Sequence, residues 1–123
     1  MDLNEVTIDD TATIDILHPN GDKTDIKITI FGGDSDQHKA QEAKNRNKNM
    51  NAARKGKKIT AEQSDAQDDD LLIASVASWE NVEENGKLLE CNSANIKKVF
   101  KAWPFVREQI NRAIVDRTNF MKS

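Results

Sequence analysis

The middle of this chain is almost free of large apolar side chains, and this gap limits where a core can form. Between residues 34 and 70 only Met50 and Ile59 are large and apolar, whereas residues 11–31 and 70–120 contain many such residues. Of the 123 residues, 37% are hydrophobic and 32% are charged. A core is therefore possible but must be small.

The first apolar stretch alternates with a period of two. Ala12, Ile14 and Ile16 fall on every second position, and so do Ile26, Ile28 and Ile30. This period places each apolar set on one face of a strand. Asn20-Gly21 lies between the two sets and favours a two-residue type I′ turn. The sequence thus predicts a β-hairpin that ends at Gly32-Gly33, and its isoleucine face must pack either on the helical part of the chain or on another copy.

The middle segment is rich in charged residues, and its basic and acidic residues fall in separate blocks. Residues 39–58 contain eight basic side chains and one acid, and residues 62–70 contain five acids and no base. Good helix formers after residue 35 predict a helix capped by Asp34, Ser35 or Asp36, followed after Arg54 by a mobile linker. The candidate electrostatic arm consists of Lys44, Arg46, Lys48, Arg54, Lys55, Lys57 and Lys58. These basic residues can have three roles. They can form a solvated arm, pair with the acidic block within or between molecules, or contact the phosphates of a nucleic acid.

The second apolar stretch predicts three helices. Leu72, Val76 and Trp79 recur at helical spacing, which indicates a first helix that ends near residues 81–84. Asn85-Gly86 then marks a turn, Asn92 or Ser93 can cap a second helix, and Pro104 separates that helix from a third. The third helix is expected to present Val106, Ile110, Ala113, Ile114 and Arg117 on one side, and Phe120 closes the module.

These segments predict an α+β fold with three parts. Residues 1–33 form the N-terminal β-hairpin, residues 34–69 form a long polar helix and charged linker, and residues 70–123 form a C-terminal three-helix module. The net charge of −3 argues against a general nucleic-acid binder.

The sequence contains no pattern of residues that supports catalysis or metal binding. His18, His38 and Cys91 lack ligand spacing, so the histidines are expected to be exposed and the thiol half-buried. The acidic run around residues 65–70 lacks the glycine of a calcium loop. Ser75 and Ser78 have no histidine nearby in sequence. We therefore expect no enzymatic activity and no cofactor.

The same absence of motifs bears on the compartment. The acidic start MDLNEVTIDD has no apolar core of a signal peptide, and no run approaches the roughly 20 apolar residues of a membrane span. A single cysteine cannot form an internal disulfide. These observations predict a soluble intracellular protein.

Aromatic and isoleucine side chains are the candidates for protein binding. They are Trp79, Trp103, Phe105, Phe120, Ile26, Ile28 and Ile30. Aromatic residues in a module this small mostly belong to the core, but they are also frequent interface anchors. Both roles remain open for these residues at this stage.

The last 54 residues resemble tail assembly chaperones of long-tailed bacteriophages. The matching motifs are Leu71-Leu72, Trp79, Asn85-Gly86, Asn95, Trp103-Pro104-Phe105, Arg107-Glu108-Gln109-Ile110 and Asp116-Arg117-Thr118-Asn119-Phe120. The hairpin resembles the β-rich N-terminal part of such proteins only loosely, and residues 34–69 are outside the resemblance.

The resemblance implies a non-catalytic protein that coats the tape-measure protein and presents it to tail-tube subunits. It further implies action in the cytoplasm of an infected bacterium, absence from the finished virion, and contact with itself or with a longer form made by ribosomal frameshifting. The chain ends soon after Phe120, where a short form is expected to end.

Two other binding functions are alternatives to the chaperone. One is a virion structural protein, such as a tail-completion or head–tail connector subunit, which would use the hairpin edge for strand addition. The other is a nucleic-acid-binding regulator that uses residues 39–58, which the adjacent acidic block disfavours.

Overall fold

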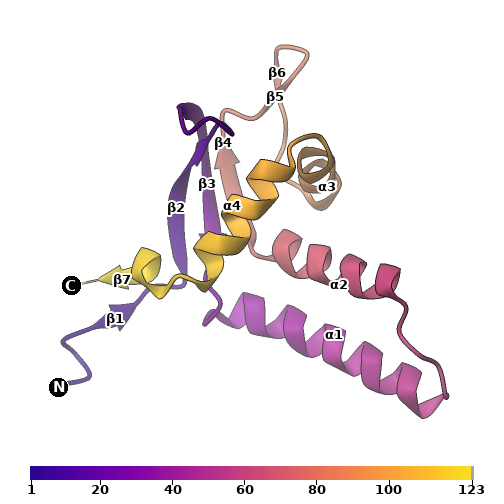
Figure 1. Cartoon of the computed structure of the whole chain (residues 1–123). Coiled ribbons are helices and arrows are strands. Elements are labelled where there is room, and N and C mark those ends of the chain that lie inside the picture. Colours follow the sequence, from indigo (N-terminus) through magenta and orange to yellow (C-terminus); the bar gives the residue numbers. More distant parts are fainter. Residues whose placement is uncertain (123) are drawn as a thin grey trace.

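A computed structural model describes residues 1–122 and confirms the α+β class. Three antiparallel strands form the central sheet in the order β2-β3-β4, with bounds Thr11–Leu17, Lys23–Phe31 and Val76–Glu80. The helices are α1 (Asp36–Arg54), α2 (Ala61–Ala74), α3 (Ser93–Ala102) and α4 (Pro104–Val115), followed by the 3-10 turn η1 (Arg117–Phe120). Figure 1 shows α4 crossing one face of the sheet, with α3 beside it.

Two short strand pairs lie outside the sheet. β1 (Thr7–Ile8) pairs with β7 (Met121–Lys122), so the two ends of the chain run together. β5 (Glu83–Glu84) and β6 (Lys87–Leu88) form a small hairpin, and its turn residues Asn85 and Gly86 both have positive φ, as predicted for an Asn-Gly turn.

The predicted N-terminal hairpin is confirmed as β2 and β3, but its turn differs. His18 N–H donates to Asp22 O at 2.7 Å, which leaves a three-residue loop over Pro19, Asn20 and Gly21. Gly21 has a φ of +93°, whereas Asn20 does not have a positive φ. A two-residue turn would make Pro19 a paired strand position, and proline has no N–H to donate there. The type I′ prediction is therefore wrong.

The isoleucine face of the hairpin packs on the helices. Ile16, Ile28 and Ile30 are buried, and they share one core with Val99 of α3 and Ile110 of α4. The core also contains Ile26, Leu72, Ile73, Val76, Val82, Ile96, Phe100, Val106, Ile114 and Phe120. This resolves the alternative left open by the sequence, because no second copy is needed to cover this face.

The predicted first helix of the C-terminal module is wrong beyond Ala74. The chain turns at Ser75 and continues as β4, so the region after residue 70 contains the end of α2, a strand, and the helices α3 and α4. A register shift opposite Thr29 and Ile30 inserts one extra residue into β4. Val76 and Trp79 consequently share the inner face although they lie three residues apart, and this bulge imitates helical spacing.

The predicted polar helix is confirmed as α1, with Ser35 as its N-cap. It ends at Arg54, where Gly56 takes a φ of +70° and Lys57 N–H donates to Ala52 O at 2.9 Å. The predicted linker over residues 55–69 is wrong from residue 61 onward, because α2 begins there. Thr60 and Gln63 form a reciprocal capping box, a signal present in the sequence.

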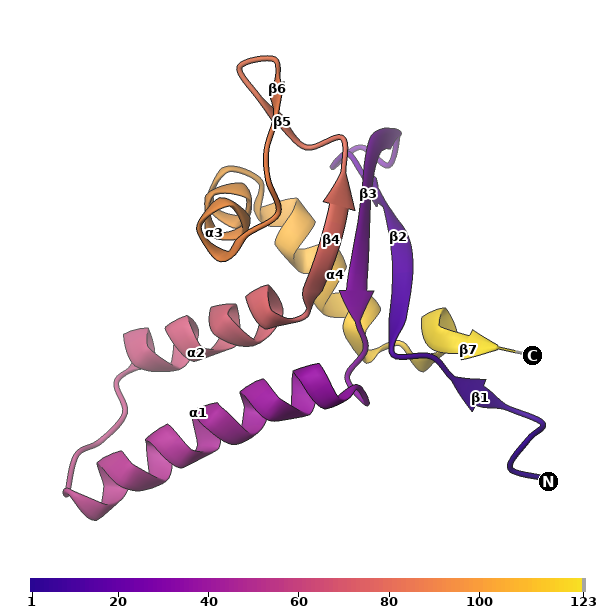
Figure 2. The same cartoon turned by 180° about the vertical axis from the view of Figure 1, so that it is seen from behind.

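α1 and α2 form a helical hairpin held by side-chain amides. Asn45 donates to the Gln67 carbonyl at 3.2 Å, and Gln67 donates to Asn49 Oδ1 at 2.6 Å. Figures 1 and 2 show this hairpin projecting from one side of the molecule and the β1–β7 pair projecting from the other. Only the ends of the helices nearest the sheet reach the core, through His38 of α1 and Leu72 and Ile73 of α2.

Candidate functional site: a groove beside the Trp103–Phe105 joint

Pro104 fixes a sharp joint between α3 and α4. Trp103 leaves the helical region, with φ −129° and ψ 76°, and Pro104 opens α4 at its first position. The Trp103 and Phe105 rings lie 6.3 Å apart at a 35° tilt, and both side chains are half-buried. The joint therefore presents two neighbouring aromatic rings that are covered on one side only.

Two hollows meet at Phe105, and we call them together the joint groove. One, of about 610 Å³, lies between β2 and α4; the other, of about 520 Å³, lies between the start of β3 and Trp103. Both are bordered by Phe105 and by His18-Pro19 of the β2–β3 loop. Apolar lining residues are Ile14, Leu17, Ile26, Trp103, Phe105 and Ala113, and polar ones include Asp15, Lys23, Asp25, Glu108, Gln109 and Arg112.

Gln109 ties the two walls of the groove together. Its Oε1 accepts from Leu17 N–H at 2.9 Å, and its Nε2 donates to Leu17 O at 2.8 Å. β2 is an edge strand, so this amide occupies backbone groups that would otherwise invite another strand. The groove thus has a fixed width at this point, and the end of the sheet edge is closed.

The other predicted protein-binding residues serve the core in this structure. Ile26, Ile28, Ile30 and Phe120 are buried, with exposures of 8% or less. Trp79 is half-buried beside Ile28, and its indole N–H donates to Leu89 O at 2.9 Å. Of the seven proposed residues, Ile26, Trp103 and Phe105 border the joint groove, and Trp103 and Phe105 are the two of these three that are half-buried.

The candidate electrostatic arm lies on α1 and on the loop that follows it. All seven of its basic side chains are exposed, and none takes part in the ion pairs that residues 1–122 form. In particular, none of these pairs joins α1 to the acidic residues of α2. Asp69 of α2 instead pairs with Arg107 of α4 at 2.8 Å. Pairing of the two charge blocks within one molecule is therefore not observed.

A third hollow, separate from the joint groove, lies where the two ends of the chain meet the body. It measures about 390 Å³ and is bordered by Gly32-Gly33, Asp34 and Arg117, as well as by Ile8, Asp9, Asp10, Ser35, His38, Glu42, Ile114, Val115 and Phe120. Asp34 accepts two hydrogen bonds from Arg117, at 2.7 and 3.1 Å. These bonds hold the pKa of the Asp34 carboxyl below its ordinary value and raise the pKa of Arg117.

His38 is buried, which corrects its expected exposure, and it contacts a serine 37 residues away. Its Nδ1 lies 2.9 Å from Ser75 Oγ, and its Nε2 lies 3.7 Å from Glu42 Oε1. Because Ser75 Oγ donates to Leu71 O at 2.9 Å, it accepts from His38 Nδ1–H. Ser75 is fully buried and borders neither the joint groove nor the hollow beside Asp34 and Arg117. The three residues therefore offer no exposed nucleophile, and they join α1 to the α2–β4 bend.

Helical amphipathicity gave no signal for His38, because it lies at the start of a polar helix. The Ser35 N-cap was the available clue, since it places His38 at the third helical position, one turn from the sheet.

The other chemical candidates remain separate. His18 is exposed in the β2–β3 loop, and Cys91 is half-buried, where desolvation raises the pKa of its thiol. Within residues 1–122, no cluster of three or more His, Cys, Asp or Glu side chains has the arrangement of a metal site. Across the same residues, no helix has the length and apolar character to span a bilayer.

Comparisons of the chain with family models, curated proteins and solved structures found no match.

Proposed function

We propose that this protein is a non-catalytic tail assembly chaperone of a long-tailed bacteriophage, which binds the tape-measure protein and helps to recruit tail-tube subunits. The observation that carries the proposal is the Trp103-Pro104-Phe105 motif. It is one of the motifs that carry the resemblance, and its two rings border an open groove. A binding role for this motif needs exposed aromatic surface, and these two side chains provide it.

The groove has the character expected for a helical client. Its apolar lining is flanked by charged residues of both signs, including Asp15, Lys23 and Arg112. An amphipathic helix can place its apolar face on such a lining and its polar face toward solvent. A tape-measure protein is long and helical, so many copies of the chaperone can each bind one weak site along it, and multivalency supplies the overall hold.

The proposal places the protein in the cytoplasm of the infected bacterium during assembly and outside the mature virion. The first test is co-expression of untagged chaperone with the tagged tape-measure protein of the same phage, followed by capture and measurement of the soluble fraction. We expect both chains to co-purify and the tape-measure protein to become more soluble. Absence of association at low salt would contradict the proposal.

The second test assigns binding to the groove. Phe105→Ala removes one aromatic wall, and we expect client affinity to fall by about tenfold or more, as for an interface anchor. Leu88→Ala is the matched control, because Leu88 is 73% exposed on the β5–β6 hairpin and lines none of the hollows. Equal losses in both variants, each shown to be folded by circular dichroism, would remove the groove from the proposal.

A virion structural role is the alternative, and the β1–β7 pair favours it. This two-stranded pair projects from the body and has free edges, a form that suits strand addition between subunits. Mass spectrometry of purified virions separates the two functions: a chaperone is absent from the particle, whereas a tail-completion or connector subunit is present.

A further inference from the structure

The two projecting ends of this molecule carry opposite charges. We call residues 1–10 together with Met121 and Lys122 the terminal ribbon, and residues 50–60 the hairpin tip. Residues 1–10 contain four acidic side chains and no basic one, and residues 50–60 contain four basic side chains and no acidic one. The acids are Asp2, Glu5, Asp9 and Asp10, and the bases are Arg54, Lys55, Lys57 and Lys58. Even with Lys122, the ribbon retains an excess of acid.

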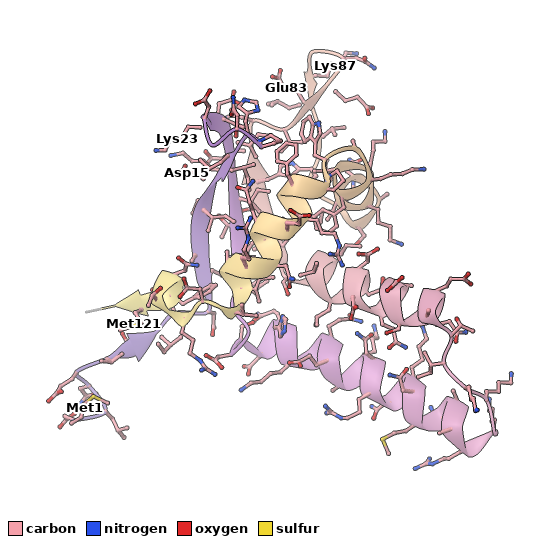
Figure 3. All side chains as sticks on the ribbon, viewed as in Figure 1. Met1, Asp15, Lys23, Glu83, Lys87 and Met121 are labelled. Atoms are coloured by element: carbon pink, nitrogen blue, oxygen red, sulfur yellow. The ribbon has the colours of Figure 1, made fainter. Side chains whose placement is uncertain are left out.

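Both ends also expose large apolar side chains. On the terminal ribbon, the exposed fractions are 103% for Met1, 93% for Leu3, 44% for Ile8 and 48% for Met121. Figure 3 labels Met1 and Met121, which lie on the ribbon and away from the helical hairpin. The hairpin tip exposes Met50 and Ile59, at 49% and 37%. Each end therefore combines unused apolar surface with charge of one sign.

Most of the charged side chains at the two ends take part in none of the ion pairs found among the described residues. None of the ion pairs among the described residues involves Asp2, Glu5 or Asp10, or any basic residue of the hairpin tip. Figures 1 and 2 place the ribbon and the tip on opposite sides of the molecule. The tip and the ribbon of one folded chain therefore cannot contact each other. A surface that binds either of them must belong to another molecule.

We propose that the hairpin tip of one copy docks on the terminal ribbon of a second copy. The contact pairs unlike surfaces, so it is heterologous and extends head to tail into rings or open chains. The complementary sign and the matching apolar residues favour a second copy over nucleic acid, which would offer phosphates but no partner for Met50 and Ile59. The contact does not depend on the tape-measure client and is tested without it.

Sedimentation velocity of the untagged full chain tests the contact. At about 100 µM protein we expect oligomers in 20 mM NaCl that dissociate in 500 mM NaCl, because salt screens exposed charges. A protein that stays monomeric in low salt, including one whose tip instead binds a DNA duplex, would overturn the proposal. Oligomers that resist high salt and charge reversal would overturn it as well.

Charge exchange gives the most specific result. Lys57→Glu/Lys58→Glu removes the net positive charge of residues 50–60, because Arg54 and Lys55 then face two acids on the same segment. Asp2→Lys/Glu5→Lys removes the net negative charge of residues 1–10 in the same way. We expect each variant alone to associate at least tenfold more weakly than wild type. We expect an equimolar mixture to regain association, because the unaltered tip of the ribbon variant then meets the unaltered ribbon of the tip variant. Lys97→Glu/Lys101→Glu, on exposed positions of α3, is the control and should not change association. A mixture no better than its components would refute the head-to-tail contact.

Discussion

Gly32 packs against the ring of Phe120, near the C-terminal end of the chain. Replacing Gly32 by alanine adds one methyl group and tests this contact. A Cβ atom at Gly32 would lie 3.1–3.2 Å from three atoms of the Phe120 ring. The glycine is held in place, since its N–H donates to Asp10 O and its carbonyl accepts from Ser35 N–H and Oγ–H. Phe120 is also held, being 3% exposed with its carbonyl accepting from Asp9 N–H at 2.7 Å.

Because neither the Gly32 backbone nor the Phe120 ring can move freely, Gly32→Ala must create overpacking. Such strain costs about 1–3 kcal/mol in well-packed cores. At about 2.1 cal/mol/K per residue, the unfolding entropy of this chain is roughly 0.26 kcal/mol/K, so each kcal/mol lowers Tm by about 4 °C. We therefore expect Gly32→Ala to unfold about 4–12 °C below wild type in thermal melts followed by circular dichroism at 222 nm.

Gly33→Ala is the matched control one residue away. Its added Cβ would lie 3.5 Å from Ile114 O, an ordinary contact, so its free energy of unfolding should stay within about 0.5 kcal/mol of wild type. A double-mutant cycle with Phe120→Leu adds a second check, since the smaller side chain should relieve part of the Gly32→Ala cost. Equal stability of the two alanine variants would refute the packing of Phe120 on Gly32.

Three further predictions concern polar contacts. Ser75→Ala leaves His38 Nδ1–H buried without its acceptor, so urea unfolding should show a loss of about 1–3 kcal/mol, and a smaller loss in a His38→Leu background. Thr60→Ala removes the capping box of α2 and should cost about 1 kcal/mol, with faster hydrogen exchange in the first turn of that helix. Arg117→Met should return the pKa of Asp34 toward its ordinary value, as measured by NMR titration. Since the folded pKa of Asp34 is lowered, its stabilising contribution is present above about pH 4 and is lost as the pH falls through the folded value, so the Tm difference from wild type should shrink in acid.

Local signals predicted much of this fold correctly. The period-two isoleucines gave β2 and β3, Asn92 gave the start of α3, and Pro104 gave the boundary between α3 and α4. Each of these signals acts through the residue's own backbone or through near neighbours. They are readable without knowing which distant segment lies alongside.

Two of the corrections to the predictions have a non-local cause. The bulge in β4 depends on its pairing with β3, and only that pairing shows that Val76 and Trp79 occupy one face of a strand. The contact between His38 and Ser75 likewise joins two segments whose proximity follows from the tertiary fold. The Thr60 capping box and the β2–β3 loop are different, because the Thr60–Gln63 pair and Pro19 are local signals that were available in the sequence.

The candidate binding surface was also only partly predictable, because local patterns named its residues and the tertiary fold decides which of them are exposed. Sequence reasoning placed seven apolar residues together as candidates, and the fold separates them by burial. The isoleucines and Phe120 complete the core that orients α4, and α4 in turn holds Phe105 against the β2–β3 loop. Under the proposed function, a substitution at Phe120 would therefore lower client binding indirectly, through stability, whereas one at Phe105 would act on the groove itself. Comparing the two variants at a temperature where both are folded separates a structural effect from a recognition effect, because only the Phe105 variant should then lose affinity.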